Sequence, residues 1–119
     1  MTTLIACLST GKGTWGHVAR LIADEDWEKV ILITNEFGKE NFKIEKKDVE
    51  LIVVNSMKFL PELIEDIKKQ LEGKIKGTEV ALNMVSGSGK EHMALLSALL
   101  KLGLGIRLIA LTKEGIKEI

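Results

Sequence analysis

The sequence predicts an α/β domain, a three-layer sandwich in which helices cover both faces of a mainly parallel sheet. Short apolar runs alternate along the chain with stretches of helical periodicity, a pattern that requires crossover connections and so favours parallel strands. The apolar runs show little polar alternation, as expected of strands that are covered on both faces. With 119 residues, the chain has the size of one domain, which we expect to span 1–119.

Five near-continuous apolar runs are the expected parallel strands. After the fifth run, a tight turn at 112–115 leads into a short segment that we expect to form an antiparallel sixth strand at the edge of the sheet. The six predicted strands are 4–8, 30–34, 51–55, 80–85, 106–111 and 116–119.

Helical periodicity fills the gaps between these runs. The first expected helix, 14–23, begins at Thr14, a favourable N-cap residue. The clearest helix, 60–75, repeats apolar residues at helical spacing and carries Pro61 in its first turn. The charged segment 37–48 is only loosely periodic, so it predicts either a short helix or an irregular crossover.

The helix expected at 90–102 differs from the others because apolar side chains surround most of its circumference. A helix of that kind is buried on two sides, and a chain this short has little else to cover the second side. Large exposed apolar patches mark interfaces between proteins. We therefore expect a homodimer through the helix 90–102. The alternative is that the segment 37–48 covers the patch within one chain.

Charge and composition exclude several classes of partner. Lysine plus arginine and aspartate plus glutamate number 17 each, so no global field attracts duplex DNA or an anionic membrane. The start of the chain lacks the features of a secretory signal, and the apolar region 93–111 is interrupted by charges and glycines. Cys7 is the single cysteine, and two histidines give no zinc spacing. We expect a cytoplasmic protein without metal or cofactor that binds neither membranes nor duplex DNA.

A glycine-rich loop after the first strand is the first candidate binding site. It contains a G-x-G-x-x-G pattern between a strand and a helix, at the carboxyl end of the sheet, where ligands of open parallel sheets bind. Backbone N–H groups of such a loop hold a phosphate at the helix N-terminus, while hydroxyls and a lysine add donors and charge. The predicted ligand-binding residues here are Ser9, Thr10, Gly11, Lys12, Gly13 and Thr14.

The same pattern also fits a small Rossmann-fold protein that binds a dinucleotide or an adenine nucleotide. That interpretation requires an acidic residue after the second strand to hold a ribose, and Glu36 occupies about that position. Lys12 and the bulky Trp15 are unusual within the motif, and no second nucleotide-binding half follows. A third interpretation is a tight turn that binds nothing.

A second loop, 86–90, follows the fourth strand and begins the apolar helix. It is not a Walker P-loop, because Met84 takes the place of a glycine and Glu91 takes the place of the hydroxyl that binds magnesium. A lysine at a helix N-terminus is unfavourable unless an anion lies nearby, so Lys90 indicates a bound phosphate. The predicted ligand-binding residues of this loop are Ser86, Gly87, Ser88, Gly89 and Lys90.

Other polar residues are placed near the same end of the predicted sheet. The loops after the second and third strands can offer contacts to a ribose or a base, and Asn35 is the predicted ligand residue among them. His17 and His92 occur in the first turns of the helices that follow the two glycine loops. Each is expected more often to serve the structure than to contact a ligand.

Taken together, these features resemble the CRISPR-associated Rossmann-like (CARF) domains, which sense cyclic oligoadenylates. In that family the fourth strand ends in Asn or Asp, and a Thr/Ser-Gly-Gly-Thr-Lys-like turn and a methionine-containing apolar helix follow. Here Asn83, Ser86-Gly87-Ser88-Gly89-Lys90 and Met93 occur in that order. Ser9-Thr10-Gly11 is similar to the family's first loop, and the last two strands are similar to its terminal hairpin. The resemblance covers essentially the whole chain and implies a Rossmann-like fold.

The resemblance also implies a function and a mechanism. It implies a homodimer in CRISPR antiviral signalling that binds a two-fold symmetric cyclic oligoadenylate across its interface, each subunit contributing both glycine loops. Some members without an effector resemble metal-independent ring nucleases, in which a ribose 2′-hydroxyl attacks the adjacent phosphate and leaves a 2′,3′-cyclic phosphate. Carried over, Ser9 or Thr10 would orient the ring and Lys90 would stabilise charge, which makes Ser9 and Lys90 the catalytic candidates. His92 is the candidate general base.

Overall fold

The computed structural model of the chain describes residues 2–8, 12–44 and 48–119. Within these ranges strands and helices alternate along the chain. The elements are β1 (Thr3–Cys7), the 3₁₀ turn η1 (Lys12–Thr14), α1 (Trp15–Asp24), β2 (Lys29–Thr34), α2 (Glu36–Asn41), β3 (Val49–Val53), α3 (Leu60–Leu71), β4 (Glu79–Asn83), α4 (Gly89–Lys101), β5 (Gly105–Thr112) and β6 (Gly115–Glu118).

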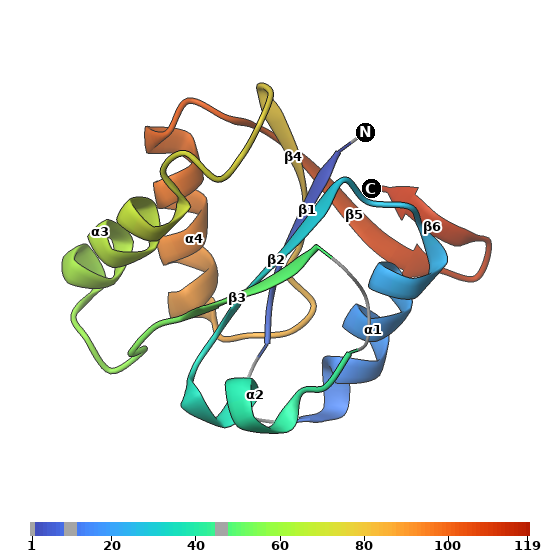
Figure 1. Cartoon of the computed structure of the whole chain (residues 1–119), viewed down its shortest axis with the longest axis horizontal. Coiled ribbons are helices and arrows are strands. Elements are labelled where there is room, and N and C mark those ends of the chain that lie inside the picture. Colours follow the sequence, from blue (N-terminus) through green and yellow to red (C-terminus); the bar gives the residue numbers. More distant parts are fainter. Residues whose placement is uncertain (1, 9–11, 45–47) are drawn as a thin grey trace.

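The strands form one six-stranded sheet in the order β3-β2-β1-β4-β5-β6 (Figure 1). All neighbouring pairs are parallel except β5 and β6, which are antiparallel with Thr112 opposite Gly115. The chain starts at the centre, moves outward through β2 and β3, and then returns to β4 on the other side of β1. The predicted α/β class, with a mainly parallel Rossmann-like sheet and an antiparallel edge strand, is confirmed.

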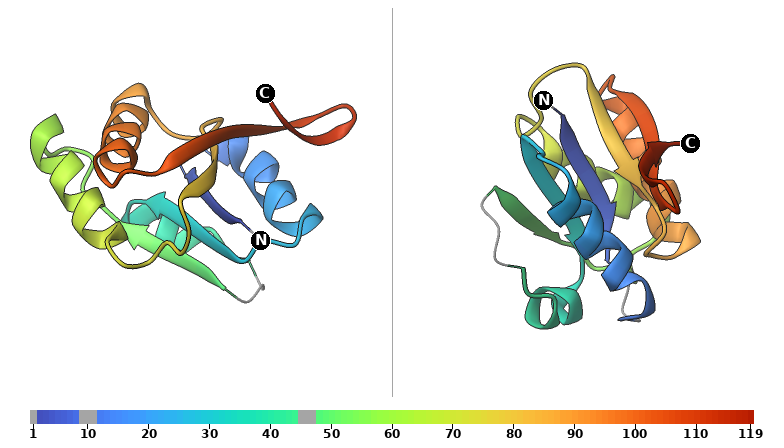
Figure 2. Two further views of the ribbon diagram at one scale, coloured as in Figure 1. Left: turned by 90° about the horizontal axis from the view of Figure 1, so that it is seen from above. Right: turned by 90° about the vertical axis from the view of Figure 1, so that its right-hand side faces the viewer.

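Helices cover both faces of this sheet and bury two apolar clusters. On one face α3 and α4 pack together against the strands, and side chains such as Ile67 and Leu95 are fully buried there. On the other face α1 packs against the sheet with Leu21 and Ile22, while the β5–β6 hairpin extends past the body of the domain (Figure 2). The molecule is therefore the expected three-layer sandwich. Within the ranges described, no helix has the length and apolar character needed to cross a membrane.

Several boundaries differ from those predicted. The helix expected at 60–75 ends at Leu71, because Gly73 adopts a left-handed conformation with φ of 76° and turns the chain away. In the segment 37–48 the helical alternative is confirmed only for the short helix α2. Thr14 takes the N-cap position of α1, but its side chain makes no capping hydrogen bond, since the turn η1 leads directly into the helix.

Candidate functional site

The first loop and the second loop leave the sheet beside each other. Strands β1 and β4 are paired, with Ala6 opposite Asn83, and the strand order reverses between them. Ser9, Thr10 and Gly11 lie outside the described residues. Lys12, Gly13 and Thr14 form η1 and lead into α1. The sheet thus brings the loop after β4 to the place where ligands bind in open parallel sheets.

The shape of the second loop depends on a glycine. Gly87 has a φ of 111°, and a β-carbon there would lie 2.9 Å from Cβ of Cys7 and 2.9 Å from Nε2 of His92. The loop therefore passes directly over the end of β1, at a distance that only glycine permits. Gly87, which the sequence predicts as a ligand contact, has this independent structural reason to be a glycine.

The ring of His92 holds the same loop. Its Nε2 lies 2.8 Å from the carbonyl oxygen of Ser86, a residue that is itself buried. A carbonyl oxygen only accepts hydrogen bonds, so Nε2 carries the proton and donates. Nε2 of His92 therefore positions the loop. Because it already carries a proton, it cannot accept one from a ligand.

A capping box closes the N-terminus of α4. Ser88 Oγ accepts the Glu91 N–H at 3.2 Å, and Glu91 Oε1 accepts the Ser88 N–H at 2.8 Å. The side chain of Ser88, a predicted ligand residue, thus caps the helix. In the first turn of α4, the backbone N–H groups of Gly89 and Lys90 are left to bind an anion. The buried carboxyl of Glu91 stands beside them. Glu91 was not among the site residues predicted from the sequence, although the Ser-x-x-Glu spacing signals its role.

Lys90 links the second loop to the loop after β3. Its Nζ donates a hydrogen bond to the carbonyl oxygen of Ser56 at 2.9 Å, while the side chain stays exposed. An ammonium group has three N–H donors, so two remain for an anion. The bond holds a positive charge at the carboxyl end of the sheet, where the sequence predicts a phosphate.

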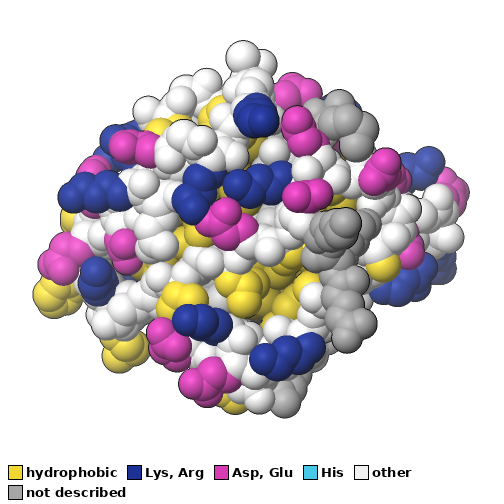
Figure 3. Space-filling model, in the orientation of Figure 1, with side chains coloured by type: hydrophobic (Ala, Val, Ile, Leu, Met, Phe, Trp, Pro, Cys, Tyr) yellow, Lys and Arg dark blue, Asp and Glu magenta, His cyan; other side chains and the backbone are white. Residues whose placement is uncertain are grey.

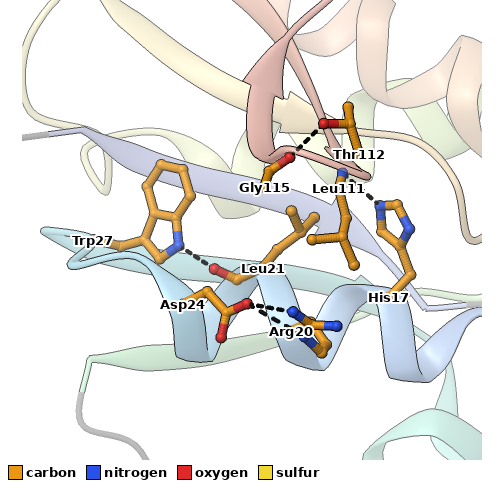
Figure 4. A network of polar contacts seen from close by, with 8 residues as sticks. All are labelled: His17, Arg20, Leu21, Asp24, Trp27, Leu111, Thr112 and Gly115. Carbon is orange, nitrogen blue, oxygen red and sulfur yellow. Dashed lines mark hydrogen bonds and ion pairs between the residues drawn. The ribbon is translucent and has the colours of Figure 1, made fainter.

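Asn83 and His17 connect β4, β5 and α1 below the loops. The amide of buried Asn83 donates to Ile109 O at 2.9 Å and accepts from Val85 N at 3.2 Å, so its oxygen and nitrogen are both used by the fold. His17 Nε2 accepts the backbone N–H of Leu111 at 3.3 Å (Figure 4), and Asn83 Nδ2 lies 3.3 Å from the same atom. Nε2 of His17 is therefore unprotonated and faces two donors, which gives this histidine a structural role.

An aromatic cluster explains the bulky residue in the glycine motif. Trp15 is buried at the start of α1, with its ring centroid 5.5 Å from that of Phe42 in an edge-on arrangement and 6.0 Å from that of Phe37. Such pairs stabilise beyond their buried area. Trp15 therefore joins α1 to the segment around α2, a packing role unrelated to the binding of a dinucleotide.

Asn35 begins helix α2. Its Oδ1 accepts the N–H of Gly38 at 2.9 Å, a normal N-cap bond. A β-carbon at Gly38 would lie 1.8 Å from Oγ1 of Thr34, so α2 rests directly on the end of β2. Asn35 reaches the carboxyl end of the sheet as predicted, with its side-chain oxygen already capping a helix.

Cys7 is not a nucleophile in this fold. Burial raises the pKa of its thiol from 9.0 to about 12, and the negative charge of Glu91 acts in the same direction. The thiol is therefore protonated at neutral pH. Among the residues described, no group of His, Cys, Asp and Glu side chains is arranged to hold a metal ion.

Comparisons with known proteins do not identify a family for this chain. No protein-family model matches the sequence, and no curated protein matches it. Among solved structures, the chain is similar to a crystal structure of the FMN-dependent cysteine decarboxylase TvaF from thioviridamide biosynthesis. That match has 13% identity, covers 89% of each chain and has a TM-score of 0.37. A likeness this weak carries no functional argument, so the function must be argued from the residues of the site.

Proposed function

We propose that this protein is a homodimeric receptor for a cyclic oligoadenylate, as its resemblance to CARF domains implies. The observation that carries the proposal is the second loop, which Gly87 and His92 fix over the end of β1. Lys90 lies in the first turn of α4, and its charged Nζ is held at the carbonyl oxygen of Ser56. A rigid loop with a lysine at a helix start is suited to a phosphodiester.

The outer face of α4 supports the dimer. Met93 is 59% exposed and Leu100 is 65% exposed, and with Leu96 they line a hollow of about 630 Å³. The alternative was that the segment 37–48 covers this apolar patch. Within the described residues it does not, because Phe42 and Ile44 pack into the cluster on the opposite face of the sheet. Exposed apolar patches of this kind mark interfaces.

Pairing of two α4 helices would give the proposed binding site a two-fold symmetry that matches a cyclic oligoadenylate. Helix α4 begins at Gly89, directly after the second loop. A two-fold axis beside α4 would therefore bring both copies of the loop to one interface. A ring with matching two-fold symmetry could then present equivalent phosphates to both copies of Lys90.

A thermal-shift titration tests the proposal. A ligand that binds only the folded state raises the melting temperature, by an amount set by its concentration relative to Kd. At micromolar ligand concentration, we expect cyclic tetra-adenylate or cyclic hexa-adenylate to raise it, and NAD, ATP and S-adenosylmethionine to have no effect. A shift with NAD or ATP alone would instead support the small adenine-nucleotide-binding protein, and no shift with either ring at high micromolar concentration would refute the proposal.

Incubation with labelled ring decides between sensing and cleavage. In cleavage, a ribose 2′-hydroxyl would give its proton to water and bond through its oxygen to the adjacent phosphorus. The bond from phosphorus to the 5′-oxygen would break, and that oxygen would take a proton from water, with Lys90 offsetting the charge. Nε2 of His92 donates to Ser86 and cannot act as the base, so His92 could take the 2′-hydroxyl proton only through Nδ1, and we expect any such cleavage to be slow. Linear product with a 2′,3′-cyclic phosphate in the presence of EDTA would establish a ring nuclease. An intact ring would establish a sensor.

A further inference from the structure

A hollow at the carboxyl ends of β2 and β3 lies outside the two glycine loops. It has a volume of about 640 Å³ and is lined by the start of α2 and by residues 53–57. Figure 3 shows the face of the molecule that carries β3 and α2, on which hydrophobic side chains are exposed. The volume lies within the range of small-molecule sites, and the position is one where ligands of parallel sheets bind.

The walls suit the face of a flat ring. Phe37 is 38% exposed and Met57 is 85% exposed, and both line the hollow. Aromatic rings and thioethers make favourable contacts with aromatic faces, and bases stack on such side chains in many nucleotide-binding proteins. Exposed apolar groups beside a hollow therefore indicate a heteroaromatic ligand.

Asn55 can read the edge of such a ring. Its Oδ1 accepts the backbone N–H of Met57 at 3.0 Å, which fixes the orientation of the amide before any ligand arrives. The oxygen keeps a second lone pair, and the nitrogen carries two donors. An asparagine amide pairs with adenine by donating to N7 and accepting from the N6 amino group.

The charges around the hollow favour different parts of a nucleotide at different places. Ser56 is part of the wall, and its carbonyl oxygen lies 2.9 Å from Nζ of Lys90, so a positive charge stands at that rim. Glu36 lines the hollow from the side of α2 and repels anions. A phosphate is therefore favoured beside Lys90, and a neutral base is favoured inside.

We propose that this hollow is an adenine subsite. The base stacks against Phe37 and Met57, Asn55 contacts N6 and N7, and Lys90 meets the attached phosphate. The inference rests on the proposed function for its ligand and adds the base recognition that the glycine loops lack. It nevertheless requires only that the chain binds an adenine nucleotide, so the two can be tested apart.

The test is a nuclear magnetic resonance titration of ¹⁵N-labelled protein with AMP at millimolar concentration. We expect the backbone amide signals of Asn55 and Met57 to shift. Tubercidin 5′-monophosphate, which replaces N7 of adenine by carbon, should bind the native protein at least fivefold more weakly than AMP. Asn55→Asp keeps the acceptor for the Met57 N–H but loses the donor, so it should bind AMP more weakly and show no such difference.

A matched control and three further outcomes complete the test. Phe59 is 78% exposed at the start of α3 and does not line the hollow, so Phe59→Ala should bind AMP as the native protein does. Unmoved signals with AMP, in a protein that binds the cyclic ring, would overturn the subsite and leave the proposed function standing. Shifted signals without ring binding would support the subsite and refute the proposed function. If Asn55→Asp prefers AMP to tubercidin monophosphate as strongly as the native protein does, the role of Asn55 is overturned.

Discussion

A β-carbon at Gly87 would lie 2.9 Å from Nε2 of His92, the atom that donates to the carbonyl oxygen of Ser86. The absence of a side chain at Gly87 lets the imidazole approach, and the imidazole in turn holds the loop that contains the glycine. The loop after β4 is thus fixed by two residues that depend on each other. A fixed loop suits a ligand that it must meet without rearrangement, because little ordering then accompanies binding.

Gly87→Ala should lower the free energy of unfolding by about 1–3 kcal/mol, the range for a residue forced into a left-handed conformation. The new methyl group would also press on Cys7 and His92. Gly89→Ala is the matched control, since a β-carbon at this helical position meets no atom within 4 Å, and it should be neutral or slightly stabilising. Urea denaturation measures both, and equal stabilities would contradict the strained conformation of Gly87.

Lys90→Ala should weaken binding of cyclic oligoadenylate by at least about 1 kcal/mol, the low end for a charge-assisted hydrogen bond. The loss should shrink as the salt concentration rises, because exposed charges are screened. Lys76→Ala is the control, as Lys76 lies near Thr3 at the amino end of the strands, opposite to the carboxyl end that carries Lys90. Isothermal titration calorimetry checks the pair, and unchanged affinity of Lys90→Ala would remove the second loop from the site.

Glu91→Gln should strengthen binding of the ring about twofold to fivefold, in line with about 0.3–1 kcal/mol for a charge near a helix terminus. Glutamine at this position still accepts the Ser88 N–H, so the capping box is retained. The substitution removes a buried negative charge from beside the predicted phosphate. Calorimetry at low salt tests it, and weaker binding would indicate that Glu91 itself contacts the ligand.

Leu100→Lys should convert the proposed dimer to a monomer, since it places a charge at the C-terminal end of the exposed apolar face of α4. Phe59→Lys changes an apolar residue that is even more exposed but does not line this hollow, and the variant should remain dimeric. Sedimentation equilibrium distinguishes the two states. A native protein that is monomeric at high micromolar concentration would contradict the dimer directly.

The thiol of Cys7 should make stability fall at alkaline pH. Below pH 9 the folded and unfolded chains both hold the proton, whereas between pH 9 and about 12 only the unfolded chain releases it. The free energy of unfolding should therefore decline through this interval by up to about 1.4 kcal/mol per pH unit from this group. Urea denaturation of the native protein and Cys7→Ala over this range should give a shallower slope for the variant. Parallel slopes would contradict the raised pKa.

The sheet could be predicted because its signals are local. Near-continuous apolar runs such as β2 and the tight turn before β6 identify strands by composition and spacing alone. The end of α3 could not be placed, since Ile75 continues the helical spacing although Gly73 has already turned the chain. The apolar pattern indicates which residues pack against the core but not whether they are helical. Ile75 packs against the core although it lies outside the helix.

The candidate site was harder to predict, because residue type does not reveal which atoms are already engaged. Ser88 and Asn35 are polar residues at the carboxyl end of the sheet, as expected, yet both cap helices. Trp15 was an unexplained residue in a glycine motif until its contacts with Phe37 and Phe42 were seen. These partners lie more than twenty residues away in sequence, and only the folded chain brings them together.

The pairing of β1 with β4 has a consequence for how the site comes into being. Ala6 lies opposite Asn83, so the two loops of the proposed site come from distant parts of the chain. No continuous peptide cut from either half would contain both, and separate halves would have to reassemble across the middle of the sheet before any affinity appeared. Ligand binding in this protein would then serve as a reporter of a completed sheet, usable to follow reassembly of complementary fragments.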